Sequence, residues 1–368
     1  MNLFDPIPKT PIRSAHISDI HFGAMNPEYQ YKILHEQFIG YLIKNPVDII
    51  CINGDLFDRN FLASSLPVYY AMRFINELAS YCISYNCSLI LLQGTASHDN
   101  KQLQLFYNLK GLDGLDLHII TDITLLNIKN LFIGCIPELY NLDELRYRTV
   151  LNAPTDLTIL HGTLKELAPF NTEVGLSGRT PVFCINHFRN TTLVMSGHIH
   201  KPSSYANFQY CGSPYTWKFG EEYDKGFFIV TQVPCERNYS LEFIKIKSIE
   251  YKTIKIDDII NKPPNEIRDY INSLDDGESV YRIKADNVTS NLLSSINILK
   301  DYYSKNNRYK IVINNIEQLK ENNSVEIPDK FSFILDKNLS PYEVLSTYIS
   351  IVHEADISPQ EIFDLLKK

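Results

Sequence analysis

Apolar residues in the first third of the chain form short strand-like runs that alternate with longer stretches of helical spacing. The runs 11–17, 47–52 and 87–92 predict buried strands, whereas residues 28–44 and 68–81 carry apolar side chains every three or four positions and predict helices. A polar loop follows each strand-like run. This repeated order predicts parallel strands with right-handed crossovers, and functional side chains in such sheets gather at the carboxyl ends of the strands.

The pattern changes twice further along the chain. Short strand-like runs crowd together between residues 117 and 232 and are interrupted by a predicted helix near 142–151. Beyond about residue 247 a few strands and helices alternate, and the last part holds two helical segments that each begin at a Ser-Pro pair. We therefore predict an α/β fold. It comprises a two-layered β-sandwich flanked by helices in residues 1–248, a small α+β domain in residues 249–335 and C-terminal helices in residues 336–368.

Composition indicates a soluble globular protein and limits its partners. Hydrophobic residues make up 44% and charged residues 21% of the 368 positions. The formal net charge of -8 argues against a generally basic surface for nucleic acid, although bound divalent cations would supply positive charge locally. The seven cysteines contain no Cys-x-x-Cys pair, and no signal peptide or apolar run of about 20 residues is present. We expect a cytoplasmic protein that does not act at a membrane.

Acidic residues and histidines follow several of the strand-like runs. His198 and His200 lie two positions apart in Ser-Gly-His-Ile-His, so on extended backbone they would project to the same face. Asp19 and His21 have the same spacing. The other candidates that follow strand-like runs are Asp55 and Asp58, His98 and Asp99, and His161. Because strand ends meet at one edge of a sheet, these side chains predict a single metal site.

Two divalent ions about 3.5 to 4 Å apart clamp a phosphate when one carboxylate bridges them. Asp55 is the natural bridge because it is central in the set, and several histidines with few carboxylates favour manganese, iron or zinc. His98 is placed to give a proton to the leaving oxygen, with Asp99 holding its ring. Asp58 is expected to support the site, either by hydrogen bonding to a ligand histidine or by capping the next helix.

Together these motifs resemble the calcineurin-like metallophosphoesterase superfamily over roughly residues 11–232. The matching stretches are Asp19-x-His21, Gly54-Asp55-x-x-Asp58, His98-Asp99, His161 and Gly197-His198-x-His200. Further stretches look like the SbcD-type nuclease subunit, the bacterial and phage counterpart of the MRN-complex nuclease. They are Tyr210-Cys-Gly-Ser-Pro214, Phe219-Gly-Glu and Lys225-Gly-Phe. A chain rich in Ile, Asn, Lys and Tyr also suits an AT-rich phage.

The resemblance implies the metallophosphoesterase fold with a DNA-capping domain, and a role for each motif. One manganese ion would be held by Asp19, His21, Asp55 and His200, the other by Asp55, His161 and His198, and His98 would be the catalytic histidine. It further implies a manganese-dependent exonuclease and single-strand endonuclease that acts on DNA in recombination and repair. The implied assembly is a homodimer with an SbcC-like ABC-type ATPase, and we expect the apolar helical stripes within 336–368 to dock on that ATPase.

One motif departs from the family pattern. The family usually has Gly-Asn-His-Asp, in which the asparagine amide oxygen binds the second metal, whereas this chain has Gly94-Thr-Ala-Ser-His-Asp99. Ser97 takes the place of the asparagine by adjacency to His98, and Thr95 does so by adjacency to Gly94. A hydroxyl is a poorer neutral ligand than an amide oxygen, so we expect the second ion to be held more weakly.

Two other functions fit the same residues. A hydrolase of the same superfamily could act on small phosphoesters, which nitrophenyl phosphates would reveal. The missing asparagine is also compatible with a non-cleaving scaffold subunit that has a degenerate metal site, in which case metal content would discriminate.

Overall fold

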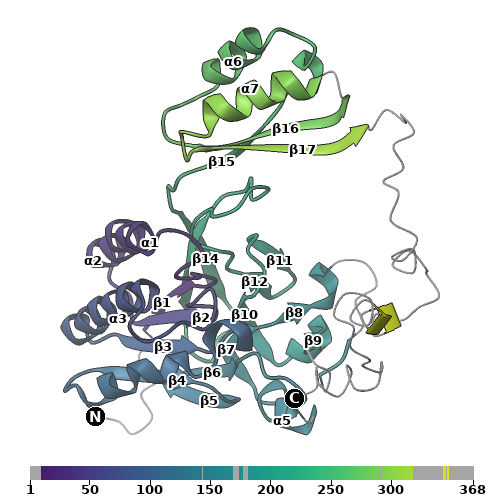
Figure 1. The fold of residues 1–368 in the computed structure, drawn as a ribbon. Coiled ribbons are helices and arrows are strands. Elements are labelled where there is room, and N and C mark those ends of the chain that lie inside the picture. Colours follow the sequence, from purple (N-terminus) through teal and green to yellow (C-terminus); the bar gives the residue numbers. More distant parts are fainter. Residues whose placement is uncertain are drawn as a thin grey trace, which may run out of the picture. The chain divides into compact units, whose positions relative to one another are not determined.

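The computed structural model describes most of the chain and divides it into two compact units (Figure 1). The described residues are 10–142, 144–168, 174–176, 181–289, 292–317, 343–344 and 346–347. The first unit comprises residues 1–254, 269–283 and 303–311, and the second comprises 255–268, 284–302 and 312–368. Apart from two residue pairs, the helices predicted in 336–368 lie outside the described residues.

One six-stranded sheet has the order β14-β13-β1-β2-β3-β4. Its strands are β1 (Ile12–Ile17), β2 (Ile49–Asn53), β3 (Ser88–Leu92), β4 (Asp116–Ile120), β13 (Gly226–Gln232) and β14 (Tyr239–Lys245). Strands β1 to β4 are parallel, and β13 adds to β1 in the antiparallel direction. The helices α1 (Pro27–Ile33), α2 (Gly40–Lys44) and α3 (Leu66–Tyr85) cover its outer face, and a π-helical stretch at Leu34–Ile39 joins the first two.

The second six-stranded sheet has the order β11-β12-β10-β7-β6-β5. Its strands are β5 (Thr124–Ile128), β6 (Leu131–Ile136), β7 (Thr155–His161), β10 (Thr191–Gly197), β11 (Ser203–Tyr205) and β12 (Phe208–Tyr210). Strands β6, β7, β10 and β12 run parallel, and helix α5 (Glu144–Leu151) packs beside β6. Short elements lie between strands of the same sheet. In the first sheet α4 (Ala96–Asp99) and a 3-10 helix at Gln102–Gly111 come between β3 and β4. In the second sheet the paired strands β8 (Thr163–Leu164) and β9 (Val182–Phe183) come between β7 and β10. Further 3-10 turns span Lys165–Leu167 and Ile185–Phe188.

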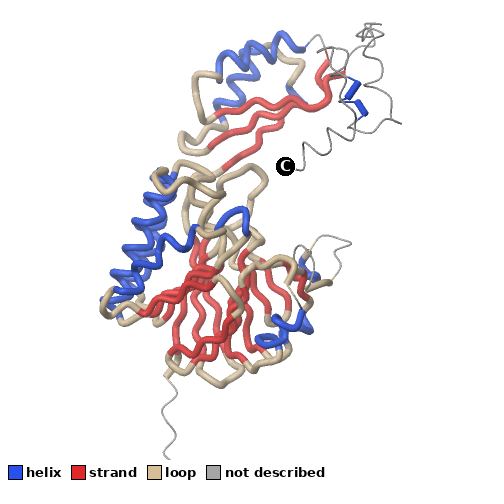
Figure 2. The backbone as a smooth tube through the Cα atoms, turned by 60° about the horizontal axis from the view of Figure 1, so that its bottom comes forward, coloured by secondary structure: helices blue, strands red, loops and turns tan. Residues whose placement is uncertain are grey.

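The two sheets pack face to face, as Figure 2 shows, and share one of three apolar clusters. All residues of β2 are buried. Alternate side chains point to opposite faces of the sheet, and both faces are covered. Ile50 and Ile52 pack among the helices, whereas Ile49 and Cys51 pack in the cluster between the sheets. Burial on both faces explains why this strand appears in the sequence as an almost continuous apolar run. The predicted two-layered α/β fold is therefore confirmed.

The elements beyond residue 250 alternate strand and helix, in the predicted order. They are β15 (Tyr251–Lys255), a 3-10 turn at Asp257–Ile259, α6 (Pro264–Ser273), β16 (Val280–Thr289), α7 (Leu293–Tyr303) and β17 (Tyr309–Glu317). The three strands form a separate sheet in chain order. Ile267 and Ile271 of α6 are fully buried at a spacing of four residues, which is the helical period predicted there. The domain boundaries themselves stay a prediction.

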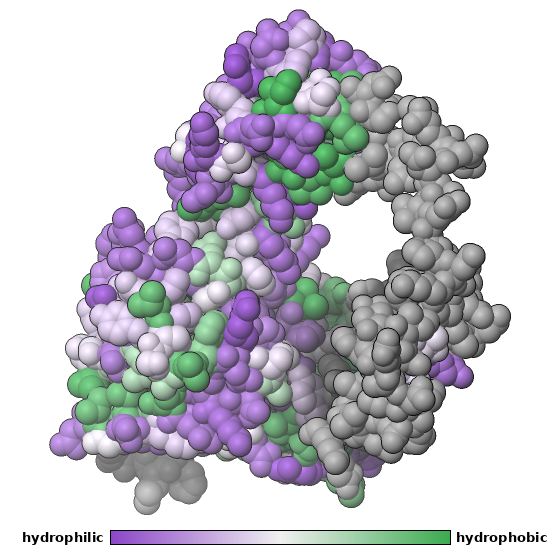
Figure 3. Space-filling model, viewed as in Figure 1, coloured by the Kyte–Doolittle hydropathy of each residue, from purple (hydrophilic) through white to green (hydrophobic). Residues whose placement is uncertain are grey.

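The face of the large sandwich visible in Figure 3 is mostly hydrophilic, with small and scattered apolar patches. Within the part of the chain that the structure describes, no helix has both the length and the apolar character needed to cross a lipid bilayer.

Candidate metal centre

The predicted ligands follow strands that are neighbours in each sheet. Asp19 and Asp55 come after β1 and β2, which pair in parallel, while His161 ends β7 and His198 follows its parallel neighbour β10. Two hydrogen bonds connect the sheets at this edge. The His198 amide donates to Asp19 Oδ1 (3.0 Å), and His161 Nδ1 donates to the Asn53 carbonyl oxygen (2.8 Å). The sandwich thus brings the carboxyl ends of both sheets to one place.

The backbone at this edge is unusual because four predicted ligands adopt positive φ. The angles are 51° at Asp19, 49° at His21, 53° at Asp55 and 90° at His198. Such conformations cost non-glycine residues about 1–3 kcal/mol each and persist only where the surroundings enforce them. Here the Asp19 amide donates to the Gly54 carbonyl (3.1 Å) and the His21 amide donates to the Asp55 carbonyl (3.0 Å). Four of the eleven non-glycine residues with positive φ in the described chain are therefore predicted ligands.

Two glycines allow the loops to approach the ligands closely. A Cβ atom at Gly54, where φ is 91°, would lie 2.2 Å from His161 Nδ1, and one at Gly94 would lie 2.2 Å from the Asp55 amide nitrogen. Both distances are far shorter than van der Waals contact. These glycines are required because backbone, and not side chain, must pack against the ligands.

One ligand cluster consists of Asp19, His21 and His200, whose ligand atoms lie within 4.8 Å of one another. His21 Nε2 and His200 Nε2 are 3.2 Å apart, so two imidazole nitrogens converge on one point. Burial lowers the pKa of His21 to about 4, which keeps its ring neutral as a metal ligand must be. His200 Nδ1 donates to Glu221 Oε1 (3.0 Å), and this leaves Nε2 free for a cation.

A second cluster consists of Glu138, His161 and His198. Glu138 Oε2 lies 3.3 Å from His198 Nδ1 and 3.7 Å from His161 Nε2. Burial opposes protonation of His161, but the neighbouring carboxylates, Asp55 above all, hold its pKa well above the ordinary value. Two imidazoles drawn toward buried carboxylates form a strong site for a divalent cation, which would replace the protons.

Asp55 lies between the two clusters. Its Oδ2 is 3.3 Å from His161 Nε2 and 3.7 Å from His21 Nε2, one nitrogen from each cluster. Although its burial disfavours the charged form, the nearby histidines lower the pKa of Asp55, so the carboxylate stays ionised. This position suits a carboxylate that bridges two ions. The mixture of imidazole and carboxylate donors fits divalent transition metals.

His98 lies beside the first cluster on the short helix α4. Its ring centroid is 4.8 Å from that of His21, and its Nδ1 donates to the Asp58 carbonyl oxygen. The sequence interpretation of Asp99 is wrong in one respect, because this carboxylate does not hold the His98 ring. Asp99 is fully buried and accepts hydrogen bonds from the backbone amides of Gly94 (2.9 Å), Phe57 (3.1 Å) and Leu56 (3.4 Å). It joins two loops and leaves the orientation of His98 to a backbone carbonyl.

The remaining predicted residues differ in how closely they approach the site. The Thr95 amide donates to Asp55 Oδ1 (2.6 Å), and its hydroxyl lies 3.2 Å from Asp55 Oδ2. Ser97 is exposed, and no hydrogen bond in the described chain joins it to a ligand. Asp58 Oδ1 is 4.0 Å from His21 Nδ1, too far for a hydrogen bond, and its other oxygen pairs with Arg59.

Sequence reasoning missed two acidic residues of this site, Glu138 and Glu221. Glu138 lies two residues after β6 in Ile-Pro-Glu, so the rule that ligands follow strand ends would have found it. Glu221 belongs to Phe219-Gly-Glu, a stretch to which the sequence alone assigns no chemical role. A lone glutamate in an irregular segment carries no spacing signal.

A two-sheet sandwich with two adjoining groups of candidate metal ligands and a carboxylate between them is the arrangement of a metal-dependent hydrolase. The family model described as calcineurin-like phosphoesterase matches residues 12–202, just over half of the chain. The chain belongs to this family, which consists of metal-dependent phosphoester hydrolases.

Some solved structures match the chain with low sequence identity and low TM-scores. The protein TT1561 of Thermus thermophilus is 11% identical over 64% of this chain and 99% of its own, with a TM-score of 0.36. The cold-active protein-tyrosine phosphatase of a psychrophilic Shewanella species is 11% identical over 62% of this chain and 80% of its own, with a TM-score of 0.30. A search of curated proteins gave no match. The family assignment therefore rests on the family model.

Proposed function

We propose that this protein is a two-metal, manganese-dependent DNA nuclease of the SbcD type. It would act as an exonuclease and a single-strand endonuclease in an SbcCD-like recombination and repair complex. The observation that carries this proposal is that two of the stretches resembling SbcD-type subunits contact His200 of the first cluster, and the third contributes Lys225, which pairs with the glutamate that His200 contacts. These stretches therefore help to hold the first cluster in place.

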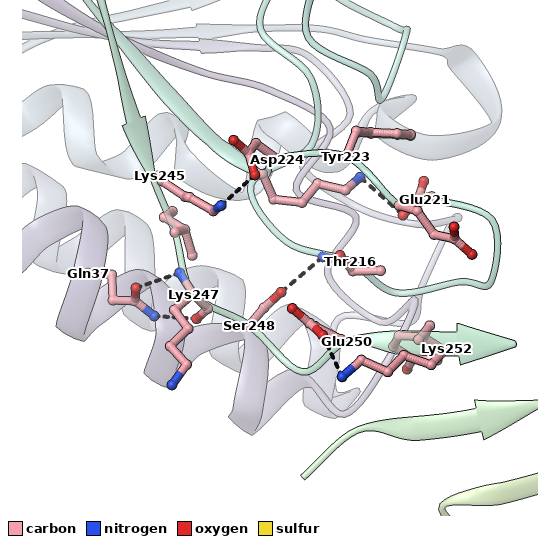
Figure 4. A pocket seen from close by; sticks show the side chains of 14 residues that line it. Gln37, Thr216, Glu221, Tyr223, Asp224, Lys245, Lys247, Ser248, Glu250 and Lys252 are labelled. Carbon is pink, nitrogen blue, oxygen red and sulfur yellow. Dashed lines mark hydrogen bonds and ion pairs between the residues drawn. The ribbon is translucent and has the colours of Figure 1, made fainter. Parts of the chain in front are cut away.

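Each of these stretches contributes a contact near His200. The Gly212 carbonyl accepts a hydrogen bond from the Ser18 hydroxyl (3.1 Å), and the Ser213 amide donates to the His200 carbonyl (3.0 Å). Glu221 accepts from His200 Nδ1, and its other oxygen lies 3.1 Å from the buried Lys225 ammonium. Glu221 and Lys225 both line a cavity of about 710 Å³, which Figure 4 shows with Glu221 labelled.

The residues of the centre have distinct roles in phosphodiester hydrolysis. When bound, the two ions would lower the pKa of a water molecule and neutralise the charge of the phosphate. Asp55 holds the two clusters at a fixed separation, and the neutral ring of His21 and the Glu221-oriented ring of His200 keep their nitrogens directed to one point. His98 donates its Nδ1 proton to the Asp58 carbonyl, so Nε2 is the atom that faces the leaving oxygen, and it gives that oxygen a proton from the imidazolium form, which leaves the ring neutral.

The proposal extends to partners and location. We expect a cytoplasmic homodimer that binds an SbcC-like ABC-type ATPase through residues 340–368. Deletion of these residues should leave a folded enzyme that no longer co-purifies with the ATPase. An insoluble product would instead indicate that the segment packs on its own chain.

A direct test compares DNA with small phosphoesters. The purified protein with Mn²⁺ should degrade single-stranded and double-stranded oligonucleotides far faster than nitrophenyl phosphates, with and without the ATPase. The His98→Ala variant, prepared in parallel, controls for contaminating nucleases. Faster turnover of the small phosphoesters would assign the chain to another hydrolase of the family. No turnover of either substrate, combined with fewer than two ions per chain, would indicate a scaffold subunit.

A further inference from the structure

The second cluster contains an oxygen ligand that the motifs do not account for. The stretch Gly94-Thr-Ala-Ser-His-Asp99 offers no asparagine amide, so only hydroxyl groups are available from this loop. Glu138 comes from another strand end, after β6, and places a carboxylate oxygen beside both histidines of the second cluster. The position left without an amide oxygen is therefore near a stronger donor.

The two oxygens of Glu138 have different surroundings. Oε1 accepts a hydrogen bond from the Tyr140 hydroxyl (2.8 Å), which fixes the carboxylate plane. Oε2 faces His198 Nδ1 at 3.3 Å and His161 Nε2 at 3.7 Å, and it receives the Thr95 hydroxyl at 3.2 Å. Since His161 Nδ1 already donates to a backbone carbonyl, its Nε2 is free to bind a metal at the same point.

The burial of Glu138 makes its negative charge costly. Glu138 is only 2% exposed, and a charged carboxylate at such depth is costly unless opposite charge compensates it. Among the described residues no lysine or arginine forms an ion pair with Glu138, and its basic partners are the two ligand histidines. A divalent cation between Oε2 and these two rings would compensate the charge and use all three donor atoms.

We propose that Glu138 is a ligand of the second metal ion and takes the place of the asparagine found in the family. The ion is then held by two histidines, by Glu138 and by the shared Asp55, so Glu138 adds a negative charge that the bridging carboxylate alone does not supply. Thr95, whose hydroxyl reaches both carboxylates at 3.2 Å, is a positioning residue that sets their separation. This inference rests on the two-metal site of the proposed function and does not depend on DNA as the substrate.

The experiment measures Mn²⁺ binding to the full chain without any nucleic acid. Calorimetry gives the number of ions and their affinities, and electron paramagnetic resonance reports whether two ions are close enough for spin coupling. Wild type should bind two coupled ions. Glu138→Ala should bind one, without coupling, at a Mn²⁺ concentration that saturates wild type. Glu138→Gln, which keeps an amide oxygen, should bind the second ion with an affinity between those of wild type and Glu138→Ala.

Two controls keep the result specific. Glu36→Gln changes an exposed glutamate in the first unit and should behave as wild type, and an unchanged first ion in Glu138→Ala shows that this variant is folded. Two coupled ions of wild-type affinity in Glu138→Ala would overturn the proposal. So would the loss of both ions together, because the first cluster has its own ligands. A wild type that binds two ions but does not cleave DNA would refute the nuclease proposal and leave the role of Glu138 intact.

Discussion

The two sides of the metal centre are built in different ways. On the first side every ligand belongs to a spaced sequence motif, and a charged pair, Glu221 with Lys225, orients His200. On the second side His161 is oriented by the backbone carbonyl of Asn53. A carboxylate oxygen of Glu138, a residue that belongs to no motif, lies beside His198. The difference shows that a metal site is defined by which strand ends meet, while motifs record only those ligands that recur at fixed spacing.

The largest expected effect comes from the residue that both sides share. Asp55→Asn should lower the affinity for both ions and abolish detectable phosphodiester cleavage, because a bridging carboxylate neutralises charge on two ions at once. Elemental analysis after dialysis and a nuclease assay would measure this. If Asp55→Asn keeps two ions per chain and full activity, the two sides do not share a ligand.

A second variant separates binding from chemistry. His98→Ala should keep wild-type metal content on both sides and lower the cleavage rate by about 10² to 10⁴-fold, the usual contribution of a positioned acid or base. In contrast, His161→Ala should lose the second ion before the first. Calorimetric Mn²⁺ titration alongside the rate measurement would show this. Metal loss from His98→Ala would make His98 a ligand, as its proximity to His21 and Asp55 allows.

The third variant addresses the first side alone. Glu221→Gln removes the charge that His200 Nδ1 faces. It should lower the affinity for the first ion by about 10 to 100-fold, the usual effect of changing a residue that orients a ligand. The second ion should keep its affinity. Glu222→Gln, at the exposed neighbouring position, is the matched control for the loss of one negative charge. Equal weakening of both ions would mean that the two sides are not independent.

The last prediction concerns stability alone and a histidine that belongs to neither side. His16 is fully buried, its Nε2 is 2.8 Å from the Ser14 hydroxyl, and burial lowers its pKa from 6.5 to about 3. The unfolded chain therefore binds a proton that the folded chain does not, so His16 reduces the free energy of unfolding as pH falls from 6.5 toward 3.

Urea unfolding at several pH values would test this prediction. His16→Gln, measured without metal, should lose less stability than wild type across that pH range. Parallel pH profiles for the two proteins would show that His16 does not contribute to acid sensitivity.

Much of the fold was predictable because burial leaves a simple signal. Strand β2 is buried on both faces and appears as an apolar run, and α3 covers a sheet and shows helical spacing. In contrast, β14 has mostly exposed and partly buried residues, which give no comparable run. Its position follows from antiparallel pairing with β13, the preceding strand, and the apolar pattern does not contain this pairing.

The candidate site was predictable to the extent that its residues share local spacing. Asp19 and His21 are two apart and come after one strand, so the pattern and the structure agree on where they lie. Asp99 is adjacent to His98, yet its carboxylate turns to backbone amides that come from two different loops. Adjacency in sequence does not determine direction in space, because the short helix α4 sends neighbouring side chains to different sides.

The carboxylate of Asp99 has a consequence for motion. By accepting the amide protons of Leu56, Phe57 and Gly94, it joins the loop that carries Asp55 to the loop that carries His98. In hydrogen–deuterium exchange these three amides should therefore exchange slowly and at a common rate, as one cooperative unit. Any opening of this region would carry the bridging carboxylate and the proton donor together.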